Sequence, residues 1–211
     1  MSKNLLHIAA ALIVVAVMVG CGGGQKPAEV QKPAEPTFIA QVKTSEPMVV
    51  AEMAKVGPFA GAGDAVGALM KWIGDKKITP AGAPFGLFMD DPAKVKPESL
   101  KWMVCVGVPD GTKGDKKAGI AVVKMPGQMI ASTIHAGAYA TVGETYSRLM
   151  QWVDQNKYEV AGPSVEYYTN PAGTPDSLLK TEVGFVVKAM TPPADTGKAP
   201  EGKKIPVPTK K

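Results

Sequence analysis

The chain has 211 residues and a formal net charge of +5 at pH 7, and 45% of its residues are hydrophobic. Residues 45–190 contain fifteen Lys and Arg and fifteen Asp and Glu, so the positive surplus lies outside this segment. A nucleic-acid-binding domain carries positive charge on its folded surface or in a dense arm, and this charge distribution excludes that class.

The N-terminal stretch MSKNLLHIAAALIVVAVMVGC combines one Lys, an apolar run and small residues before Cys21, which is the pattern of a secretory signal. Its end, Met18-Val19-Gly20-Cys21, resembles a bacterial lipobox. We therefore expect residues 1–21 to be a signal whose cysteine is diacylated, with palmitate-like chains as the membrane anchor. An ordinary signal peptide or a single N-terminal anchor is the alternative. Gly22 favours, by resemblance, the outer membrane facing the periplasm if the host is Gram-negative.

Residues 22–44 and 191–211 are rich in Pro, Lys, Glu and Gly, without apolar periodicity. Such segments bury too little apolar surface to fold, so we expect a disordered tether and a disordered tail. The remaining segment, 45–190, is long enough for one domain with its own core.

The domain contains an internal repeat. Residues 51–82 match residues 131–162 at ten of 32 positions without a gap, and both copies end a helix-like stretch in Leu-Met-x-Trp. Within 45–190 this gives repeat one at 45–110 and repeat two at 127–190. The segment between them, PDGTKGDKKAGIAVVKMPG, is interpreted as a polar crossover with room for a short strand.

Each copy shows the same order of elements. A β-branched strand, VVAEMAKV or MIASTIHA, leads through a Gly-containing turn to a helix with apolar residues at i, i+3, i+4 and i+7. Two further strands follow, APFGLFMDDP and LKWMVCVGV or PSVEYYTNP and KTEVGFVV. We predict an α+β fold of two β-α-β-β units with pseudo-twofold symmetry, an antiparallel sheet with helices on one side, and a central cleft.

The residues exclude several enzyme classes. His135 is the only histidine after the predicted signal, so no histidine cluster can bind a metal, and no cofactor is expected. Cys105 lies in the apolar run WMVCVGV and is interpreted as a buried structural thiol. The sequence also lacks a phosphate-binding loop and a nucleophile elbow.

The motifs together resemble the GyrI-like family, the effector-binding domain of multidrug-responsive bacterial transcription activators. The resemblance is carried by Gly-Ala-Tyr before a helix ending in Leu-x-x-Trp, by Ala-Gly-Pro-x-x-Glu-Tyr-Tyr-x-x-Pro, and by Lys-Thr-Glu-Val. It implies a cleft between the repeats, lined by aromatics, with a carboxylate that meets cationic or polar planar ligands. The chain departs from the family at Ala138, where Pro is frequent, and has no DNA-binding domain.

The strand KTEVGFVV offers the first candidate carboxylate. Alternation places Val183, Phe185 and Val187 on one face and Glu182 with Gly184 on the other. If the helices cover the first face, Glu182 points into the groove, and Gly184 leaves room for a ligand. Pairing of Glu182 with Arg148 on the adjacent helix is the alternative.

Four further residues are candidates for ligand contacts. Tyr139 is expected to form a pocket wall, and Phe59 is its counterpart in repeat one. Glu166 shares a strand face with Tyr168, and either a pocket position or exposure to water fits it. Tyr146, Trp72 and Trp152 are expected in the core.

Three functions fit these residues. The first is a membrane-anchored, extracytoplasmic protein that captures a small amphipathic or cationic molecule with aromatic walls and Glu182. The second is a hydrolase of strained electrophilic molecules, in which Glu182 activates water and Tyr139 acts as the acid. The third is an interaction module for an envelope protein. The polar residues concentrate in repeat two, which favours a single asymmetric ligand site.

Overall fold

The computed structural model describes residues 38–171 and 173–190, which belong to one compact unit. The expected signal with Cys21 and the expected tail lie outside the described residues, as does the tether up to residue 37. The elements are β1 (Gln41–Thr44), β2 (Met48–Val56), η1 (Phe59–Gly61), α1 (Ala62–Asp75), β3 (Phe85–Phe88), η2 (Pro97–Ser99), β4 (Lys101–Gly107), β5 (Ala121–Met125), β6 (Met129–Ala136), η3 (Tyr139–Thr141), α2 (Val142–Gln155), β7 (Tyr158–Tyr168), η4 (Asp176–Leu178) and β8 (Lys180–Ala189).

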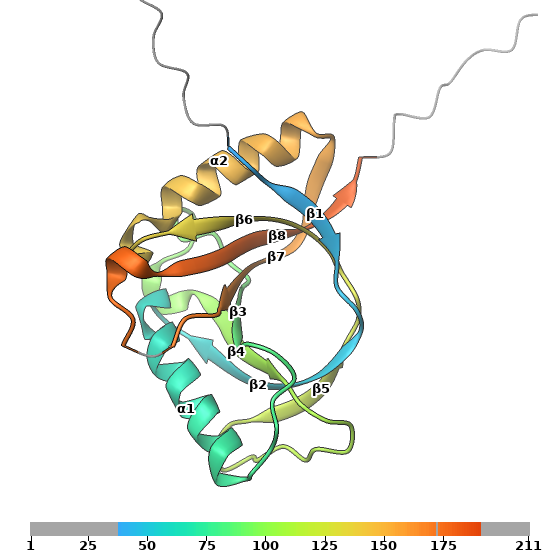
Figure 1. Cartoon of the computed structure of the whole chain (residues 1–211), viewed down its shortest axis with the longest axis vertical. Helices are drawn as coiled ribbons and strands as arrows, with labels where there is room; N and C mark the ends of the chain where they lie inside the picture. Colours follow the sequence, from blue (N-terminus) through green and yellow to red (C-terminus); the bar gives the residue numbers. More distant parts are fainter. Residues whose placement is uncertain (1–37, 172, 191–211) are drawn as a thin grey trace, which may run out of the picture. The chain divides into compact units, whose positions relative to one another are not determined.

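The eight strands form one antiparallel sheet in the order β1-β6-β8-β7-β3-β4-β2-β5 (Figure 1). The predicted α+β class and the duplication are confirmed, since each half contributes one helix and the same series of strands. The two halves meet where β3 pairs with β7 at the centre of the sheet.

The repeated unit has one strand more than predicted. β1 and β5 each precede the first predicted strand of a unit, so each unit is β-β-α-β-β. These extra strands are exchanged, because β1 pairs with β6 and β5 pairs with β2. The predicted start of the domain at residue 45 is therefore corrected to include β1. The composition of residues 22–44 concealed this strand, whose hydrogen bonds come entirely from the other unit.

Both helices pack on one face of the sheet, which we call the helix face (Figure 1). Under α1 lies a core that includes Leu69, Ile73 and Val104, and under α2 a smaller one that includes Val153 and Val187. Alternate residues of the same strands point to the opposite face, which we call the inner face. Its buried apolar residues are Val50, Phe85, Leu87, Cys105, Ile130, Val165 and Val186.

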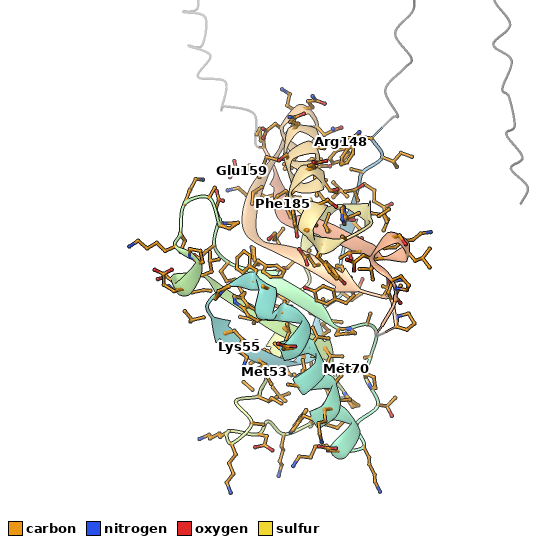
Figure 2. The ribbon with its side chains drawn as sticks, turned by 90° about the vertical axis from the view of Figure 1, so that its left-hand side faces the viewer. Met53, Lys55, Met70, Arg148, Glu159 and Phe185 are labelled. Atoms are coloured by element: carbon orange, nitrogen blue, oxygen red, sulfur yellow. The ribbon has the colours of Figure 1, made fainter. Side chains whose placement is uncertain are left out.

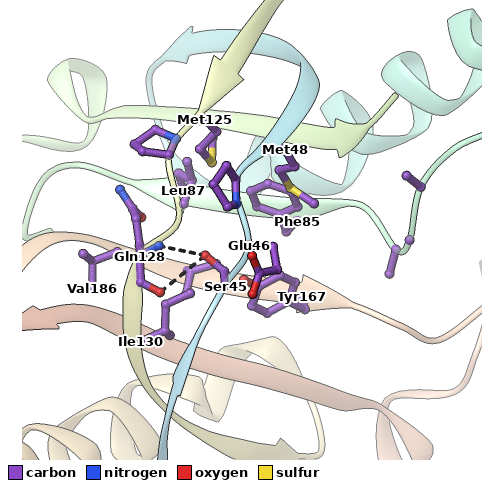
Figure 3. Close-up of a pocket in the computed structure, with 16 residues that line it drawn as sticks. Ser45, Glu46, Met48, Phe85, Leu87, Met125, Gln128, Ile130, Tyr167 and Val186 are labelled. Atoms are coloured by element: carbon purple, nitrogen blue, oxygen red, sulfur yellow. Dashed lines mark hydrogen bonds between the residues drawn. The ribbon is translucent and has the colours of Figure 1, made fainter. Parts of the chain in front are cut away.

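Two connections cross over the inner face. Residues 45–47 lead from β1 to β2, and residues 126–128 lead from β5 to β6, so each runs between the two ends of the sheet. They touch where the Ser45 amide donates to the Gln128 carbonyl at 2.8 Å and the Gln128 amide donates to Ser45 Oγ at 2.9 Å. Figure 3 shows the hydrogen bonds between the Ser45 hydroxyl and Gln128.

We predict that Gly127→Ala destabilises the fold by about 1–3 kcal/mol, because a Cβ at Gly127 would lie 2.4 Å from the Ser45 carbonyl oxygen. Urea unfolding measures the effect. The control is Gly67→Ala in α1, where a Cβ meets no atom within 4 Å and the helix should gain about 0.5–1 kcal/mol. Equal stability of Gly127→Ala and the wild type would show that the two connections do not touch.

Candidate functional site

Three predicted ligand-binding residues lie together on the helix face of the second unit. Glu166 and Tyr168 point to this face from β7, and Tyr139 begins η3, which leads into α2. The β3–β7 pairing sets Gly86 directly opposite Glu166. The site therefore lies at the junction of the two units, where pseudo-twofold symmetry places the start of each helix near the centre of the sheet.

Glu166 is the buried carboxyl at the centre of this group. The Tyr146 hydroxyl donates to one carboxylate oxygen at 3.2 Å, and the Tyr168 hydroxyl donates to the other at 3.1 Å. Glu166 is 8% exposed, and burial raises its pKa, an effect that the two tyrosine hydrogen bonds only partly offset. The described ion pairs do not include Glu166.

Aromatic rings surround this carboxyl. The Tyr139 ring meets the Tyr168 ring edge-on, with centroids 6.1 Å apart. A Cβ at Gly86 would lie 2.8 Å from the Tyr168 hydroxyl and 2.9 Å from the Phe88 ring, so glycine at position 86 allows both rings to approach. We call Glu166, Tyr139, Tyr146 and Tyr168 the carboxyl–tyrosine cluster.

Phe59, the fifth predicted residue, lies on the helix face of the first unit. Its ring meets the Phe88 ring at 4.8 Å in an edge-on arrangement and packs against the core under α1. Phe59 therefore lies on the same face of the sheet as the carboxyl–tyrosine cluster, and Gly86 lies between Phe59 and the cluster.

The second unit has a smaller side chain beside the cluster than the first unit has at the corresponding position. In the first unit Trp102 pairs with Phe88, and its indole donates to the Gly57 carbonyl at 2.9 Å. The corresponding neighbour of Tyr168 is Thr181, whose Oγ1 is buried and accepts or donates no hydrogen bond among the described residues. A smaller residue with an unsatisfied hydroxyl thus stands where the first unit has an indole, which makes this side of the fold more polar.

His135 and Tyr146 were not predicted as site residues. His135 is buried beside the cluster, with Nδ1 2.8 Å from Thr145 Oγ1 and Nε2 3.0 Å from the Ala138 carbonyl oxygen. The Tyr146 ring packs on Phe185 as the core prediction required, while its hydroxyl reaches Glu166. Helical periodicity identified the ring as core and gave no signal for the hydroxyl.

Glu182 lies on the opposite face of the sheet. The alternation argument was correct, since Val183 and Val187 face the helices and Glu182 does not. The prediction that Glu182 lies with the other candidates is wrong, because those residues occupy the helix face. Glu182 instead pairs with Lys43 of β1, whose Nζ is 2.6 Å from its carboxylate.

The alternative pairing of Glu182 with Arg148 is also corrected. Arg148 projects from α2 on the helix face (Figure 2), with its guanidinium 4.7 Å from the Phe38 ring centroid. Lys43 was missed because it lies in the predicted tether. The alternation of QVKT, with Val42 packed toward α2, was the available signal for a strand there.

The catalytic pair proposed for a hydrolase is not supported. The sheet separates Glu182 on the inner face from Tyr139 on the helix face, so the two side chains cannot act on the same substrate molecule. The helix face does hold a glutamate and tyrosines in contact, but they are Glu166, Tyr146 and Tyr168.

The inner face contains a separate cavity of about 270 Å³ beneath the two connections (Figure 3). None of the five predicted ligand-binding residues lines it. Gly184 does not provide the expected space, since a Cβ there would lie 2.8 Å from Ile130 Cγ2 and 3.2 Å from Val165 Cγ1. The lining residues include Ser45, Glu46, Met48, Phe85, Leu87, Met125, Gln128, Ile130, Val165, Tyr167 and Val186.

The remaining core predictions can be checked directly. Trp72 is buried under α1, and Trp152 stacks on Tyr158 with ring centroids 6.5 Å apart. Cys105 is buried, and burial raises the pKa of its thiol to about 12, which makes it a poor nucleophile.

Over residues 38–171 and 173–190, no group of three acidic, His or Cys side chains could hold a metal ion, and no helix is long and apolar enough to span a membrane.

Comparison with known proteins identifies the family. The model of the GyrI-like small molecule binding domain matches residues 40–188, and the chain belongs to this family. The resemblance read from the sequence is thereby confirmed. No curated protein sequence matches the chain significantly.

Solved structures share the fold at low sequence identity. The EcmrR C-terminal domain superposes with a TM-score of 0.63 at 21% identity, covering 72% of this chain and 99% of that domain. EcmrR in its DNA-bound transcription complex gives a TM-score of 0.64 at 21% identity, over 72% of this chain but only 58% of that one. A hydrolase encoded by lin2189 from Listeria innocua gives 0.54 at 11% identity, over 74% and 94% of the chains.

We predict that Glu166→Gln changes the pH dependence of stability. A raised pKa in the folded state contributes stability below the ordinary value of 4.5, and this contribution is lost as pH rises toward the folded value. The wild type should therefore lose stability relative to Glu166→Gln as the pH rises above about 4.5. Urea unfolding across this range measures the difference.

Glu159→Gln is the matched control, since Glu159 is a half-exposed carboxylate on the same strand that pairs with Lys188. Parallel stability curves for the wild type and Glu166→Gln would contradict a raised pKa at Glu166.

Proposed function

We propose that the protein captures a small amphipathic or cationic molecule at the carboxyl–tyrosine cluster, with Glu166 as its charged contact. The observation that carries this proposal is a buried carboxyl held by two tyrosine hydroxyls and ringed by aromatic side chains. It differs from the sequence-based proposal in the identity of the glutamate, since Glu182 faces away from these aromatics.

The physical argument rests on the cost of a buried carboxylate. Burial favours the protonated form of Glu166, as its raised pKa indicates, although the hydrogen bonds from Tyr168 and Tyr146 and the electrostatic interaction with His135 lower that pKa. An organic cation bound beside Glu166 would add positive charge, so its binding stabilises the carboxylate and expels the proton. The faces of Tyr139 and Tyr168 add a cation–π attraction that a neutral molecule of equal shape does not receive.

Entry to the cluster requires movement of the side chains that cover it. Glu166 is 8% exposed, whereas Tyr139 is 44% exposed and stands at the start of η3. Tyr139 is therefore the member best placed to move aside for a ligand. Thr181 stands where the first unit has the larger Trp102, and its hydroxyl has no hydrogen-bond partner among the described residues.

The cellular location is part of the proposal and rests on the N-terminal sequence. The apolar run followed by Met18-Val19-Gly20-Cys21 supports export and acylation at Cys21, with capture of the ligand at the surface of a bacterial membrane. In that compartment the domain would sequester or sense a ligand without contacting DNA.

We predict that benzyltrimethylammonium raises the melting temperature of the purified chain, and that neopentylbenzene, its neutral isostere, does so less. Glu166→Gln should weaken binding of the cation about tenfold, as expected when a charge-assisted contact is lost. Calorimetric titration measures both affinities.

The control is Glu159→Gln, which should bind the cation as the wild type does because its carboxylate is on the surface. Equal binding of cation and isostere, or undiminished cation binding by Glu166→Gln, would refute the role given to Glu166.

We also predict that the chain expressed in bacteria incorporates an alkyne-labelled fatty acid and sediments with membranes, and that Cys21→Ser loses both properties. Cys105→Ser is the matched control, because Cys105 is buried in the sheet. Label retained in Cys21→Ser would rule out the predicted anchor.

A further inference from the structure

We infer that one end of the domain, formed by the last turn of α1 and the loop between β4 and β5, docks on a membrane surface that carries anionic phospholipid headgroups. The loop comprises residues 108–120. This surface shares no residue with the carboxyl–tyrosine cluster, so it does not depend on the function proposed there. We choose a lipid as the anionic partner because of the membrane anchor proposed above.

Positive charge is concentrated at this end of the domain. Residues 71–77 and 109–124 contain seven Lys and three Asp, although residues 45–190 as a whole carry equal numbers of basic and acidic side chains. The second unit, residues 127–190, has four Lys and Arg against six Asp and Glu. An anionic surface therefore attracts the end that contains the loop and repels the second unit, which orients the domain.

Asp115 holds the loop against the end of α1. Its carboxylate accepts a hydrogen bond from the Trp72 indole at 3.3 Å and pairs with Lys76 Nζ at 3.5 Å. It also accepts hydrogen bonds from the backbone amides of Lys117 and Ala118, which fixes the turn that follows. The loop and the end of α1 lie side by side in Figure 1. Lysines from two segments that are distant in the sequence therefore share one surface.

Five exposed lysines form this surface, which we call the lysine patch: Lys76, Lys77, Lys113, Lys116 and Lys117. In the described part of the chain, Lys76 is the one member of the patch with an ion pair. The neighbouring Asp75 is already paired with Lys71 at 2.6 Å. Four of the five ammonium groups are therefore available to an anionic partner.

A layer of phospholipid headgroups fits such a surface. Lysine binds a phosphate as a point charge on a flexible stem, so it needs no preformed pocket. Each lysine close to an anionic leaflet tightens binding about fivefold. None of the large apolar side chains that the described residues expose lies within 71–80 or 109–120. Docking is therefore electrostatic, without insertion into the hydrocarbon, and should be sensitive to salt.

The anchor and the lysine patch can reach the same membrane. Residues 22–37, between Cys21 and the described domain, are sixteen residues that span at most about 55 Å. A folded domain of about 150 residues has a radius of gyration of about 15 Å and is about 40 Å across. An acyl chain on Cys21 therefore permits any end of the domain to lie on the membrane, and the charges select the end that carries the lysine patch.

The test measures co-sedimentation of the Cys21→Ser chain, which lacks the acyl anchor, with lipid vesicles. Phosphatidylcholine vesicles give the baseline, and vesicles with about one third phosphatidylglycerol present the anionic surface. We expect tighter binding to the anionic vesicles. The difference should disappear in about 1 M salt, where the screening length falls to about 3 Å. This salt comparison tests electrostatic docking without any change in the lysine patch.

Substitutions in the Cys21→Ser chain locate the contact. The triple variant Lys113→Gln, Lys116→Gln and Lys117→Gln should bind the anionic vesicles about a hundredfold more weakly, since each lysine contributes about fivefold. Its binding to phosphatidylcholine vesicles should not change.

The matched control is the triple variant Lys94→Gln, Lys96→Gln and Lys101→Gln. These lysines are also exposed, and they precede or begin β4, whereas the loop follows the end of that strand. The control should bind both kinds of vesicle as the parent does. Melting temperatures equal to that of the parent would show that both triple variants are folded.

Other outcomes overturn the inference. Equal weakening in the two triple variants would show a general charge effect without a docking surface. Undiminished binding by the patch variant would move the anionic contact to other lysines, such as those of residues 191–211. Patch-dependent retention on heparin without patch-dependent binding to vesicles would make the partner a polyanion other than lipid. Fatty-acid labelling of Cys21 tests the anchor separately, so either proposal can fail alone.

Discussion

The antiparallel pairing of β3 with β7 joins the two units, and the carboxyl–tyrosine cluster and the inner-face cavity lie on the two faces of that pair. On the helix face it sets Gly86 opposite Glu166, with Tyr168 close behind. On the inner face it sets Phe85 opposite Tyr167 and forms the floor of the cavity. A shift of register by one residue would exchange the two faces and abolish both.

The duplication accounts for the strand and helix framework that the two units share, and the different side chains of the two units account for the candidate site. The two units exchange their first strands, so neither edge of the sheet is complete without the other unit. Within this shared frame the first unit has apolar residues, such as Phe88 and Trp102, that fill its helix face. The second unit has Tyr168 and Thr181 at the corresponding places, which makes its helix face more polar there.

Much of the fold could be predicted because the sequence patterns that indicate helices and strands are local. The helical periodicity and the repeated Leu-Met-x-Trp predicted both helices, and strand alternation correctly assigned Glu182 and Val183 to opposite faces of the sheet. β1 was missed because the alternation of its four residues is a weak signal and its pairing with β6 joins residues about ninety positions apart. The family resemblance gave Tyr139, Glu166 and Tyr168 as candidate ligand contacts, but it gave no reason to prefer one glutamate over the other.

That choice depends on which face the aromatic residues occupy, and only the three-dimensional arrangement supplies it. From strand alternation alone, Glu166 fitted either exposure to water or a position in a pocket. The structure buries it between two tyrosine hydroxyls. Glu182 was given the central role because its neighbours are apolar, and the structure satisfies it with a lysine from the other unit.

The central claim is that Glu166 receives an organic cation, and carbon-13 NMR of the labelled Glu166 carboxyl tests it most directly. A pH titration without ligand should give a pKa above the ordinary value of 4.5. With benzyltrimethylammonium bound, the pKa should fall, because the cation stabilises the carboxylate. A titration curve for Glu166 that does not move when the cation binds would contradict the account.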